Sequence, residues 1–345
     1  MTELWGALTV VLAGLVQGSG VWPMKLMRKY KFEHWWFIAM LVGLVIAPWF
    51  ITLLLCPDAW QAYRQIEAST LWKANLFALA WGVANILCGL CFVRIGVALT
   101  GGILTGLGVS VGVTLPMVIK GSGLFREAPS LKSSAGEVVL LGVAVMLIGV
   151  VLAAFAGFGR DRILRASEGP RSGSFWGGLI MVIIAGALSA GISFAFVYSQ
   201  GPIVSAMKAH GAGDTPANFA VWAIGLLGGA LINVTYPAYL MTKHRSWGVL
   251  WQSWQEGALA IGIGINFMLG VALMGKGMLL LGPLGASVGF GVQQAMQMLG
   301  GQTVGFASGE WRGIGGKPRH QMYLAIAVLI TAALIMAYGN TLTKI

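Results

Sequence analysis

Residues 291–302 read GVQQAMQMLGGQ and lie inside a long apolar run that extends from about residue 279 to residue 307. The stretch carries four glutamines: Gln293, Gln294, Gln297 and Gln302. A carboxamide in lipid is costly unless it is hydrogen-bonded, so such side chains face the interior of a helix bundle or a wet cavity. Gln293 and Gln297 are four residues apart and share one helix face. The stretch therefore predicts a membrane helix with a polar face directed inward.

The composition of the whole chain also indicates a membrane protein. Its 345 residues are 57% hydrophobic and 10% charged, whereas a soluble domain carries about 25% charged residues. The formal net charge is +11, but the basic residues are scattered between apolar runs. A nucleic-acid partner would require them to gather on one soluble face. We therefore expect a polytopic protein in the lipid bilayer that binds no nucleic acid.

Runs of about 20 mainly apolar residues are long enough to cross a bilayer as helices. Ten runs qualify, at about 4–24, 34–55, 71–93, 96–119, 137–157, 174–200, 218–241, 256–275, 279–307 and 321–339. No basic segment precedes the first run, so we expect it to be a span rather than a cleaved signal. The predicted fold class is an all-α polytopic membrane protein with ten transmembrane helices.

Lysine and arginine are more frequent in one set of alternate loops, which includes residues 25–31, 158–173 and 243–245. The positive-inside rule places such loops in the cytoplasm. Both termini are then expected on the other side of the membrane.

The basic loop at 158–173 falls at the midpoint, and three short patterns before it recur in the same order after it. The matches pair Gly14, Gln17 and Trp22 with Gly186, Ser189 and Phe194, pair Asn85, Gly89 and Gly96 with Asn266, Gly270 and Gly277, and pair GVSVG (108–112) with GASVG (285–289). Chance similarity between glycine-rich spans is the alternative explanation.

A duplication of five spans makes the two halves enter the membrane in opposite directions. Such inverted repeats recur in secondary transporters, whose substrate sites lie near the midplane between the halves. The predicted organisation is an N-terminal five-helix repeat at 1–157, a basic cytoplasmic linker at 158–173 and a C-terminal five-helix repeat at 174–345.

Amides and aromatic rings lie near one another in sequence or in repeat register, and we expect them to form the substrate site. A sugar has hydroxyls that donate and accept hydrogen bonds as amides do, and its C–H faces pack on aromatic rings. The candidate substrate-binding residues are Gln17, Trp22, Trp81, Asn85, Phe194, Tyr198, Asn266, Gln293, Gln294 and Gln297. The alternative is that the amides only hydrogen-bond helices to one another.

None of the eleven acidic residues falls in the middle of an expected span. The chain therefore offers no carboxylate to a cationic drug at the midplane, and a neutral substrate is expected. No cluster of nucleophile, acid or metal ligands is evident either. CGLC (88–91) and the G-x-S-x-G matches lie within spans, without the strand and turn context that redox or hydrolase motifs need. We expect no enzyme activity, no cofactor and no metal.

Five segments resemble the L-rhamnose/proton symporters of the drug/metabolite transporter superfamily. They are WPMKLMRKYKFEHWW (22–36), WGVANILCGLCFVRIGVALTGGILTGLGVSVG (81–112), ALSAGISFAF (187–196), LGGALINV (227–234) and GFASGEWRGIGGKP (305–318). The resemblance covers nearly the whole chain. The chain departs from the family pattern in the eighth and ninth spans, where GINFMLGVALMGKG (264–277) replaces an aromatic-rich segment and GPLGASVGF (282–290) lacks an acidic residue.

The resemblance implies ten helices in two inverted halves, a bacterial inner-membrane location, and uptake of a 6-deoxyhexose with a proton; with the positive-inside rule, both termini are then expected in the periplasm. Glu256, which begins the span of Asn266, is the first candidate for proton coupling, and Glu137 is the second. The expected function is import of L-rhamnose or a related neutral sugar by alternating access, as a monomer or weak homo-oligomer. The alternatives are an exporter or facilitator of the same superfamily for another small neutral metabolite, or a membrane-embedded enzyme or receptor.

Overall fold

The computed structural model describes residues 2–94, 97–164 and 175–342, and every regular element in these ranges is a helix. The elements are α1 (Thr2–Ser19), η1 (Trp22–Leu26), α2 (Phe32–Leu41), η2 (Val42–Ile46), α3 (Ala47–Leu55), α4 (Ala59–Arg64), α5 (Ala68–Arg94), α6 (Val97–Val118), η3 (Gly123–Glu127), α7 (Ser134–Leu164), α8 (Phe175–Ser189), α9 (Gly191–Ala209), α10 (Asp214–Gly225), α11 (Leu227–Lys243), η4 (Trp247–Trp251), α12 (Trp254–Leu280), η5 (Gly285–Gly289), α13 (Phe290–Ala307) and α14 (Lys317–Thr341).

Eight helical segments of the described chain are long and apolar enough to cross a membrane, and a ninth is reached if α10 and α11 form one span bent by 48°. The all-helical prediction is confirmed, whereas the predicted count of ten apolar spans is not. The run at 279–307 makes the difference: it is helical in η5 and α13 but is absent from the apolar segments. Its glutamines and glycines lower its hydropathy, as expected for a helix that faces other helices.

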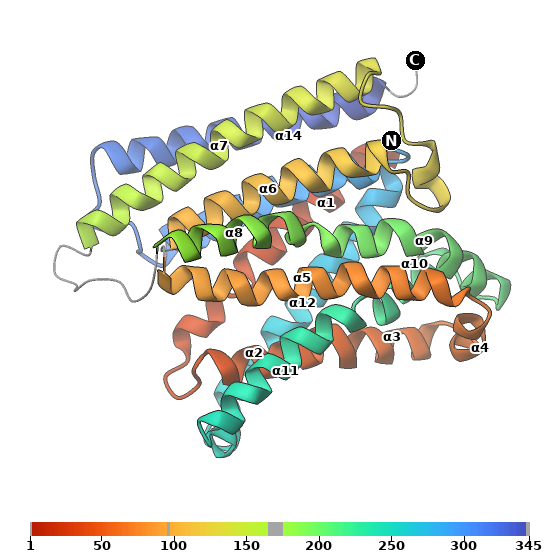
Figure 1. Ribbon diagram of the computed structural model, residues 1–345, viewed down its shortest axis with the longest axis horizontal. Helices are drawn as coiled ribbons and strands as arrows, with labels where there is room; N and C mark the ends of the chain where they lie inside the picture. The colour runs from red at the N-terminus through yellow and green to blue at the C-terminus, as the bar shows by residue number, and fades with distance from the viewer. Residues whose placement is uncertain (1, 95–96, 165–174, 343–345) are drawn as a thin grey trace.

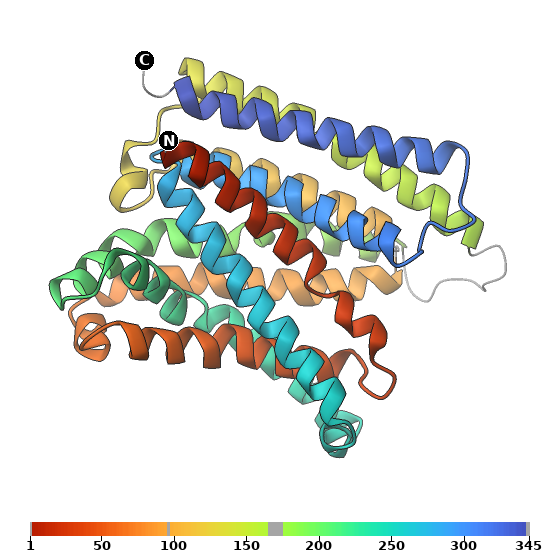
Figure 2. The same cartoon turned by 180° about the vertical axis from the view of Figure 1, so that it is seen from behind.

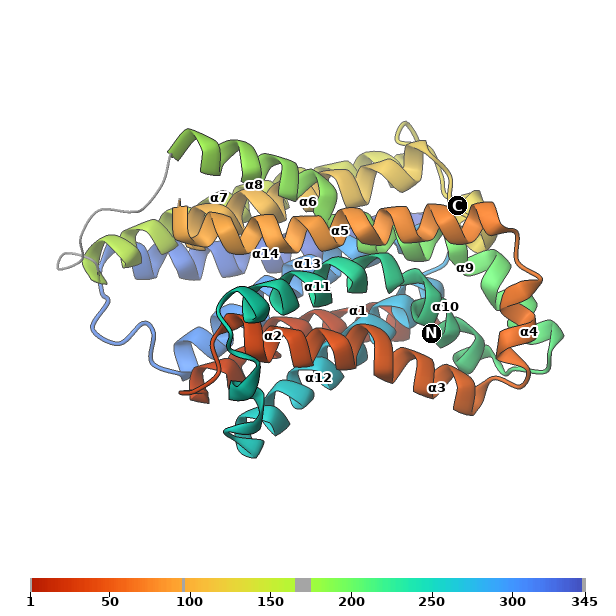
Figure 3. The ribbon, with the colours of Figure 1, turned by 60° about the horizontal axis from the view of Figure 1, so that its bottom comes forward.

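The long helices form a bundle in which partners come from distant parts of the chain (Figure 1). α7 packs along α14 at one side, and α1 crosses α12 and α13, as the view from behind shows (Figure 2). α5 packs against α8, α9 and α11, and α2 lies between α11 and α12 (Figure 3). The start of α1 and the end of α14 lie at the same end of the bundle.

Several of these helices are interrupted. α1 ends at Ser19 and continues in η1, and α8 ends at Ser189 before α9 begins at Gly191. The π-helical segment η2 lies between α2 and α3. A second π-helical segment, η5, directly precedes α13. Broken helices leave backbone groups and side chains directed at a cavity, as is common in transporters. The interruptions therefore mark where a polar site can lie.

Glycines bring α1 into close contact with α13. A Cβ on Gly14 would meet the carbonyl oxygen of Gln293, and a Cβ on Gly18 would meet that of Gln297. A Cβ on Gly300 of the partner helix would lie 2.8 Å from the Leu15 oxygen. Small residues four apart allow such a backbone approach between membrane helices. Gln17 on α1 is thereby held beside the glutamines of α13.

Gly18→Ala is expected to lower the free energy of unfolding by about 1–3 kcal/mol, because the added methyl group overpacks a helix crossing made of backbone atoms. Gly262→Ala on α12 is the matched control, since nothing lies within 4 Å of a Cβ at that position. The control should be neutral or stabilising by up to about 1 kcal/mol. Thermal unfolding of the two purified variants in the same detergent measures the difference. Equal stabilities would contradict the close crossing of α1 and α13.

Candidate functional site

A cavity of about 210 Å³ lies among helices of both halves of the chain. This is the volume of roughly seven molecules of liquid water, a space suited to a small solute. Its lining comes from α1 and the break after it, α2, α5, α6, α8, α9, α12 and α13. The lining residues are Gln17, Gly20, Val21, Trp36, Met40, Trp81, Asn85, Leu104, Ser189, Ile192, Ile263, Asn266, Phe267, Met274, Phe290, Gln293, Gln294 and Gln297.

The lining is polar but uncharged, since none of its described residues is Asp, Glu, His, Lys or Arg. Other hollows differ: one between α6, α7 and α8 is lined almost wholly by apolar side chains. No three His, Cys, Asp or Glu side chains of the described chain are arranged to hold a metal ion. The cavity can therefore hydrogen-bond a neutral polar molecule and offers no ion pair to a charged one.

Three glutamines form a connected group on one wall. The Nε2 amide of Gln293 donates to Oε1 of Gln17 and, at 3.0 Å, to Oε1 of Gln297. Gln293 is only 1% exposed, so this amide is committed to its neighbours. Gln17 and Gln297 each contribute Oε1 to this contact, so their Nε2 amides can donate to a bound molecule. This wall of the cavity therefore presents hydrogen-bond donors.

Asn85 on α5 is oriented by a residue that lies behind it. Its Nδ2 donates to Oδ1 of Asn233 at 3.3 Å, and the Nε1 of Trp36 donates to the same oxygen at 3.2 Å. Asn233 is fully buried on α11 and its own Nδ2 donates to the Gly229 carbonyl at 2.9 Å. Every polar group of the Asn233 amide is thus used, and Oδ1 of Asn85 is left to accept a hydrogen bond in the cavity.

Asn266 on α12 is fixed in a similar way by the break in α1. Its Nδ2 donates to the carbonyl oxygen of Val16 at 2.8 Å. Gly20 permits this contact, because a Cβ there would meet the Asn266 Nδ2. The Oδ1 of Asn266 remains available as an acceptor. The cavity thus combines acceptors on Asn85 and Asn266 with donors on Gln17 and Gln297, an arrangement that matches hydroxyl groups, which do both.

Aromatic rings complete the lining. The indole of Trp81 and the ring of Phe267 stack with centroids 5.8 Å apart and planes inclined by 24°. Phe290 and Trp36 line the cavity from α13 and α2. A sugar ring could place its C–H face against these rings while its hydroxyls meet the amides.

Seven of the ten residues predicted for the substrate site line this one cavity, although they come from four helices. They are Gln17, Trp81, Asn85, Asn266, Gln293, Gln294 and Gln297. Their role in binding stays a prediction, and three of the four glutamines of the apolar stretch face this shared polar space.

The structure locates the other three predicted residues outside the cavity. Trp22 lies in η1 and is 37% exposed. Phe194 is buried in the core, where it packs edge-on against Phe77. Tyr198 stacks on Phe77 and donates its hydroxyl to the Ile119 carbonyl at 2.7 Å. Trp22, Phe194 and Tyr198 follow the helix breaks after Ser19 and Ser189, so helical spacing counted from the preceding residues did not predict where they lie.

The cavity also contains residues that were not selected from the sequence. Ser189 is the repeat counterpart of Gln17, so the internal alignment already contained the signal that could have identified it. Phe267 and Phe290 stood beside predicted residues. Trp36 and Met40 on α2 gave no signal of their own, since aromatic and Met residues are frequent throughout this chain.

The structure brings neither of the two residues predicted for proton coupling to the cavity. Glu137 is exposed in the first turn of α7. The Glu256 carboxylate is buried at the start of α12, where it accepts hydrogen bonds from the backbone N–H groups of Arg28, Lys29 and Tyr30 at 2.7–3.1 Å. Burial, with the adjacent charge of Glu256, raises the pKa of Tyr30, whose hydroxyl donates to another backbone carbonyl.

The comparisons with known proteins agree on one family. The family model described as L-rhamnose-proton symport protein (RhaT) matches residues 8–342. Proteins named L-rhamnose-proton symporter from Yersinia pestis bv. Antiqua (strain Antiqua) and Yersinia pseudotuberculosis serotype O:1b (strain IP 31758) are each 33% identical to the chain over 214 residues. These matches cover 62% of the chain, and the chain spans 60% of the length of each relative.

Proposed function

Because the chain belongs to the L-rhamnose-proton symport protein (RhaT) family, we propose that it is a secondary active transporter that imports a neutral monosaccharide together with a proton. The substrate is L-rhamnose or a related sugar, and transport proceeds by alternating access. The observation that carries this proposal is the uncharged cavity, in which amide donors and acceptors converge from helices of both halves. It is a multi-pass protein of the bacterial inner membrane.

In this proposal the sugar hydroxyls donate to Oδ1 of Asn85 and Asn266 and accept from Nε2 of Gln17 and Gln297. A carbon face of the ring rests on Trp81 and Phe267. A few hydrogen bonds worth about 1 kcal/mol each, together with one packed ring, give the roughly 4–8 kcal/mol of a millimolar to micromolar ligand. Such an affinity lets the sugar bind and also leave.

The proposed architecture has ten crossings in two inverted halves, residues 1–157 and 174–345, joined by a basic linker at 158–173. Residues 165–173 of that linker lie outside the described residues.

The packing supports the duplication, because contacts between the halves occur in matched pairs. α1 packs on α12 and α13, and α8–α9 pack correspondingly on α5 and α6; α2 packs on α12, as α11 packs on α5. Gln17 and Ser189, and likewise Asn85 and Asn266, line the cavity as repeat counterparts.

The positive-inside rule supports an orientation with both termini in the periplasm and the loops at 27–31 and 244–253 in the cytoplasm. The bundle end that carries these loops also carries the ion pairs of Glu310 with Lys25 and Arg160. We expect the protein to work as a monomer or weak homo-oligomer.

Asn233→Leu is expected to raise the KM for L-rhamnose about tenfold and to leave the maximal exchange rate within about threefold. The substitution removes the acceptor of Asn85 and Trp36, and an unpaired buried donor costs about 1–3 kcal/mol, of which 1.36 kcal/mol corresponds to a factor of ten. Asn233→Asp keeps the acceptor oxygen and should restore most of the affinity. Exchange of labelled sugar in proteoliposomes measures both parameters, and an unchanged KM in the leucine variant would contradict this role of Asn233.

The proposed function is tested by uptake of labelled L-rhamnose into proteoliposomes, with and without an inward proton gradient. Wild type and the double variant Gln293→Ala/Gln297→Ala are compared. Uptake that the gradient stimulates, and that the double variant loses, is the expected result. One charge moved across 100 mV supplies about 2.3 kcal/mol, or roughly 50-fold accumulation. Uptake that ignores the gradient would overturn proton coupling, and absence of rhamnose uptake would overturn the substrate.

A further inference from the structure

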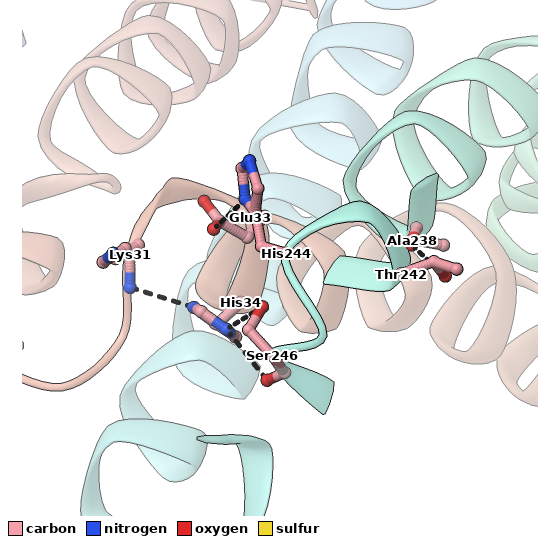
Figure 4. A network of polar contacts seen from close by, with 7 residues as sticks. All are labelled: Lys31, Glu33, His34, Ala238, Thr242, His244 and Ser246. Atoms are coloured by element: carbon pink, nitrogen blue, oxygen red, sulfur yellow. Dashed lines mark hydrogen bonds and ion pairs between the residues drawn. The ribbon is translucent and has the colours of Figure 1, made fainter. Parts of the chain in front are cut away.

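The helices that line the cavity share a reference end, where α2 begins and α11 ends. Oε1 of Glu33 on α2 lies 3.3 Å from Nδ1 of His244, the C-cap of α11. The next residue, His34, places its Nε2 3.1 Å from the hydroxyl oxygen of Ser246 (Figure 4). α12 begins there as well, because its Glu256 carboxylate accepts hydrogen bonds from the loop that leads into α2. We call this end of the bundle the loop end and describe depth in the cavity from it.

α12 carries an amide and an apolar side chain at different depths in the cavity. Both Asn266 and Met274 line it, and α12 starts at the loop end, so Met274 lies deeper by two turns, or about 12 Å. α1 runs in the opposite direction beside α12. A Cβ on Gly20 would meet the Asn266 amide, and a Cβ on Gly277 would meet Val10. The later residues of α1 therefore lie nearer the loop end.

α13 repeats this order of amide and apolar side chain. A Cβ on Gly14 would meet the carbonyl oxygen of Gln293, and a Cβ on Gly18 would meet that of Gln297. α13 is therefore parallel to α1 and runs toward the loop end. Phe290 precedes Gln293 by about one turn and also lines the cavity. The ring of Phe290 thus lies deeper than the glutamines.

α5 shows the same change with depth. It runs parallel to α11, which ends at the loop end. Nδ2 of Asn85 donates to Asn233 of α11 at 3.3 Å, and a Cβ on Gly229 of α11 would lie 2.7 Å from the indole of Trp81. Asn233 is one turn nearer the loop end than Gly229. Trp81 is therefore deeper in the cavity than Asn85.

The deep end of the cavity is lined by apolar side chains. A Cβ on Gly191 would lie 3.1 Å from the backbone nitrogen of Trp81, which places the next residue, Ile192, at the depth of Trp81. Ile192, Met274 and Phe290 are buried residues that line the cavity at or beyond this depth. None of the three has a nitrogen or oxygen atom in its side chain. We call these three residues the cavity floor.

Packed side chains lie behind the floor. A Cβ on Gly275, the residue after Met274, would lie 2.9 Å from the rings of Phe196 and Trp222, which stack with centroids 4.8 Å apart. The hydroxyl of Ser189, which lines the cavity before the floor, donates to a carbonyl of its own helix at 2.7 Å. A hydroxyl group placed against the floor would lose water and gain no partner from the floor side chains, which is costly. A methyl group there is favoured because it leaves water.

On the basis of the proposed function, we propose that the cavity floor is the subsite for the C5 methyl group of a 6-deoxyhexose. Its side chains select this sugar over one that carries a hydroxymethyl group. In a pyranose ring C5 lies opposite C2, so a methyl group on the floor directs the hydroxyls on C2 and C3 back toward the amides of Gln17, Asn85 and Gln297. The ring then rests on Trp81 and Phe267. The substrate is thus recognised by its apolar edge as well as by its hydroxyls.

The wild-type protein tests the proposal by competition. Exchange of labelled L-rhamnose is measured in proteoliposomes at equal pH on both sides, with unlabelled L-rhamnose, L-mannose or L-lyxose as competitor. L-mannose differs from L-rhamnose by a hydroxyl on C6, and L-lyxose lacks C6. Each should compete about tenfold more weakly than L-rhamnose, because an apolar pocket discriminates against a missing methylene and against an added hydroxyl to about this degree or more. Competition by L-mannose as strong as that by L-rhamnose would overturn the proposal, whereas absence of rhamnose exchange would overturn the proposed function itself.

Variants of the floor test which side chains select the methyl group. Met274→Gln and Ile192→Thr each add a hydrogen-bonding group at the floor, and each should lower the ratio of the L-mannose to the L-rhamnose inhibition constant about fivefold. Met274→Leu keeps the floor apolar and should retain the wild-type ratio. Met298→Gln makes the same change on α13 outside the cavity, and it is the matched control that should also retain the ratio.

The ratio compares two sugars on one protein sample, so it does not depend on how much of a variant folds and reconstitutes. A lower ratio in the two polar floor variants, with the wild-type ratio in Met274→Leu and Met298→Gln, supports the proposal. An unchanged ratio in both Met274→Gln and Ile192→Thr would overturn it. An equal fall of the ratio in Met298→Gln would also overturn it, since the selection would then not reside at the floor.

Discussion

Replacing Gln293 with leucine is expected to reduce kcat/KM for L-rhamnose exchange about 100-fold. The Nε2 amide of Gln293 donates to both Gln17 and Gln297, and its loss leaves two acceptor oxygens without donors. Each such loss costs about 1–3 kcal/mol when it is buried, and water in the cavity satisfies part of it. A net loss of about 2.7 kcal/mol corresponds to the 100-fold reduction. Gln17 and Gln297 would also be free to rotate, so the donor wall would lose its orientation.

Gln302→Leu is the matched control, because it makes the same change on the same helix outside the cavity. Initial rates of labelled rhamnose exchange, measured at several sugar concentrations, give kcat/KM for both variants. The Gln302 variant should stay within about threefold of wild type. Similar rates for the two variants would mean that the glutamine group only connects helices, which is the alternative that the sequence left open.

The second large effect is expected on stability. Glu256→Leu should lower the free energy of unfolding by about 2–3 kcal/mol, because it leaves the backbone N–H groups of Arg28, Lys29 and Tyr30 without their acceptor, and only that of buried Tyr30 is withheld from water. Buried donors without partners are among the most destabilising changes in a protein. The loop at 27–31 would then separate from the start of α12. Thermal unfolding in detergent, followed by the near-ultraviolet signal of the many tryptophans, measures the loss.

Glu137→Leu provides the comparison, since an exposed carboxylate in the first turn of α7 should contribute within about 0.5 kcal/mol. The two variants also separate a structural role from a coupling role. The fraction of the Glu256 variant that reconstitutes should still accumulate rhamnose with a proton gradient. A Glu256 variant that is as stable as wild type but uncoupled would restore the sequence-based prediction that Glu256 carries the proton.

The sequence identified residues that line the cavity better than it identified where the helices around the cavity are interrupted. Gln17, Asn85, Asn266 and Gln293 could be found because an amide in an apolar span has few physical explanations. Trp22 lay beyond this reasoning, because nothing in its residue type shows that α1 ends at Ser19. A period of 3.6 residues places side chains only while the helix is continuous, and interruptions at functional sites break that rule.

The same limit applies to the acidic residues. Sequence position showed that Glu256 begins a span, but it could not show that three backbone N–H groups from residues 28–30, more than 200 positions away, converge on its carboxylate. Glu33 and His244 are likewise distant in the chain, and each stands at the end of its own helix. Their pairing depends on how α2 packs against α11, which is a tertiary property that no local pattern contains.

The central claim is that a neutral sugar in this cavity moves with a proton. The most direct test adds L-rhamnose to lightly buffered proteoliposomes without an imposed gradient and follows the external pH with a membrane-impermeant dye. We predict a rise in external pH on addition of L-rhamnose, no rise with Gln293→Leu, and no rise when the vesicles are made permeable to protons. Rhamnose exchange without any change in external pH would contradict proton coupling, and absence of both signals in wild type would contradict the account as a whole.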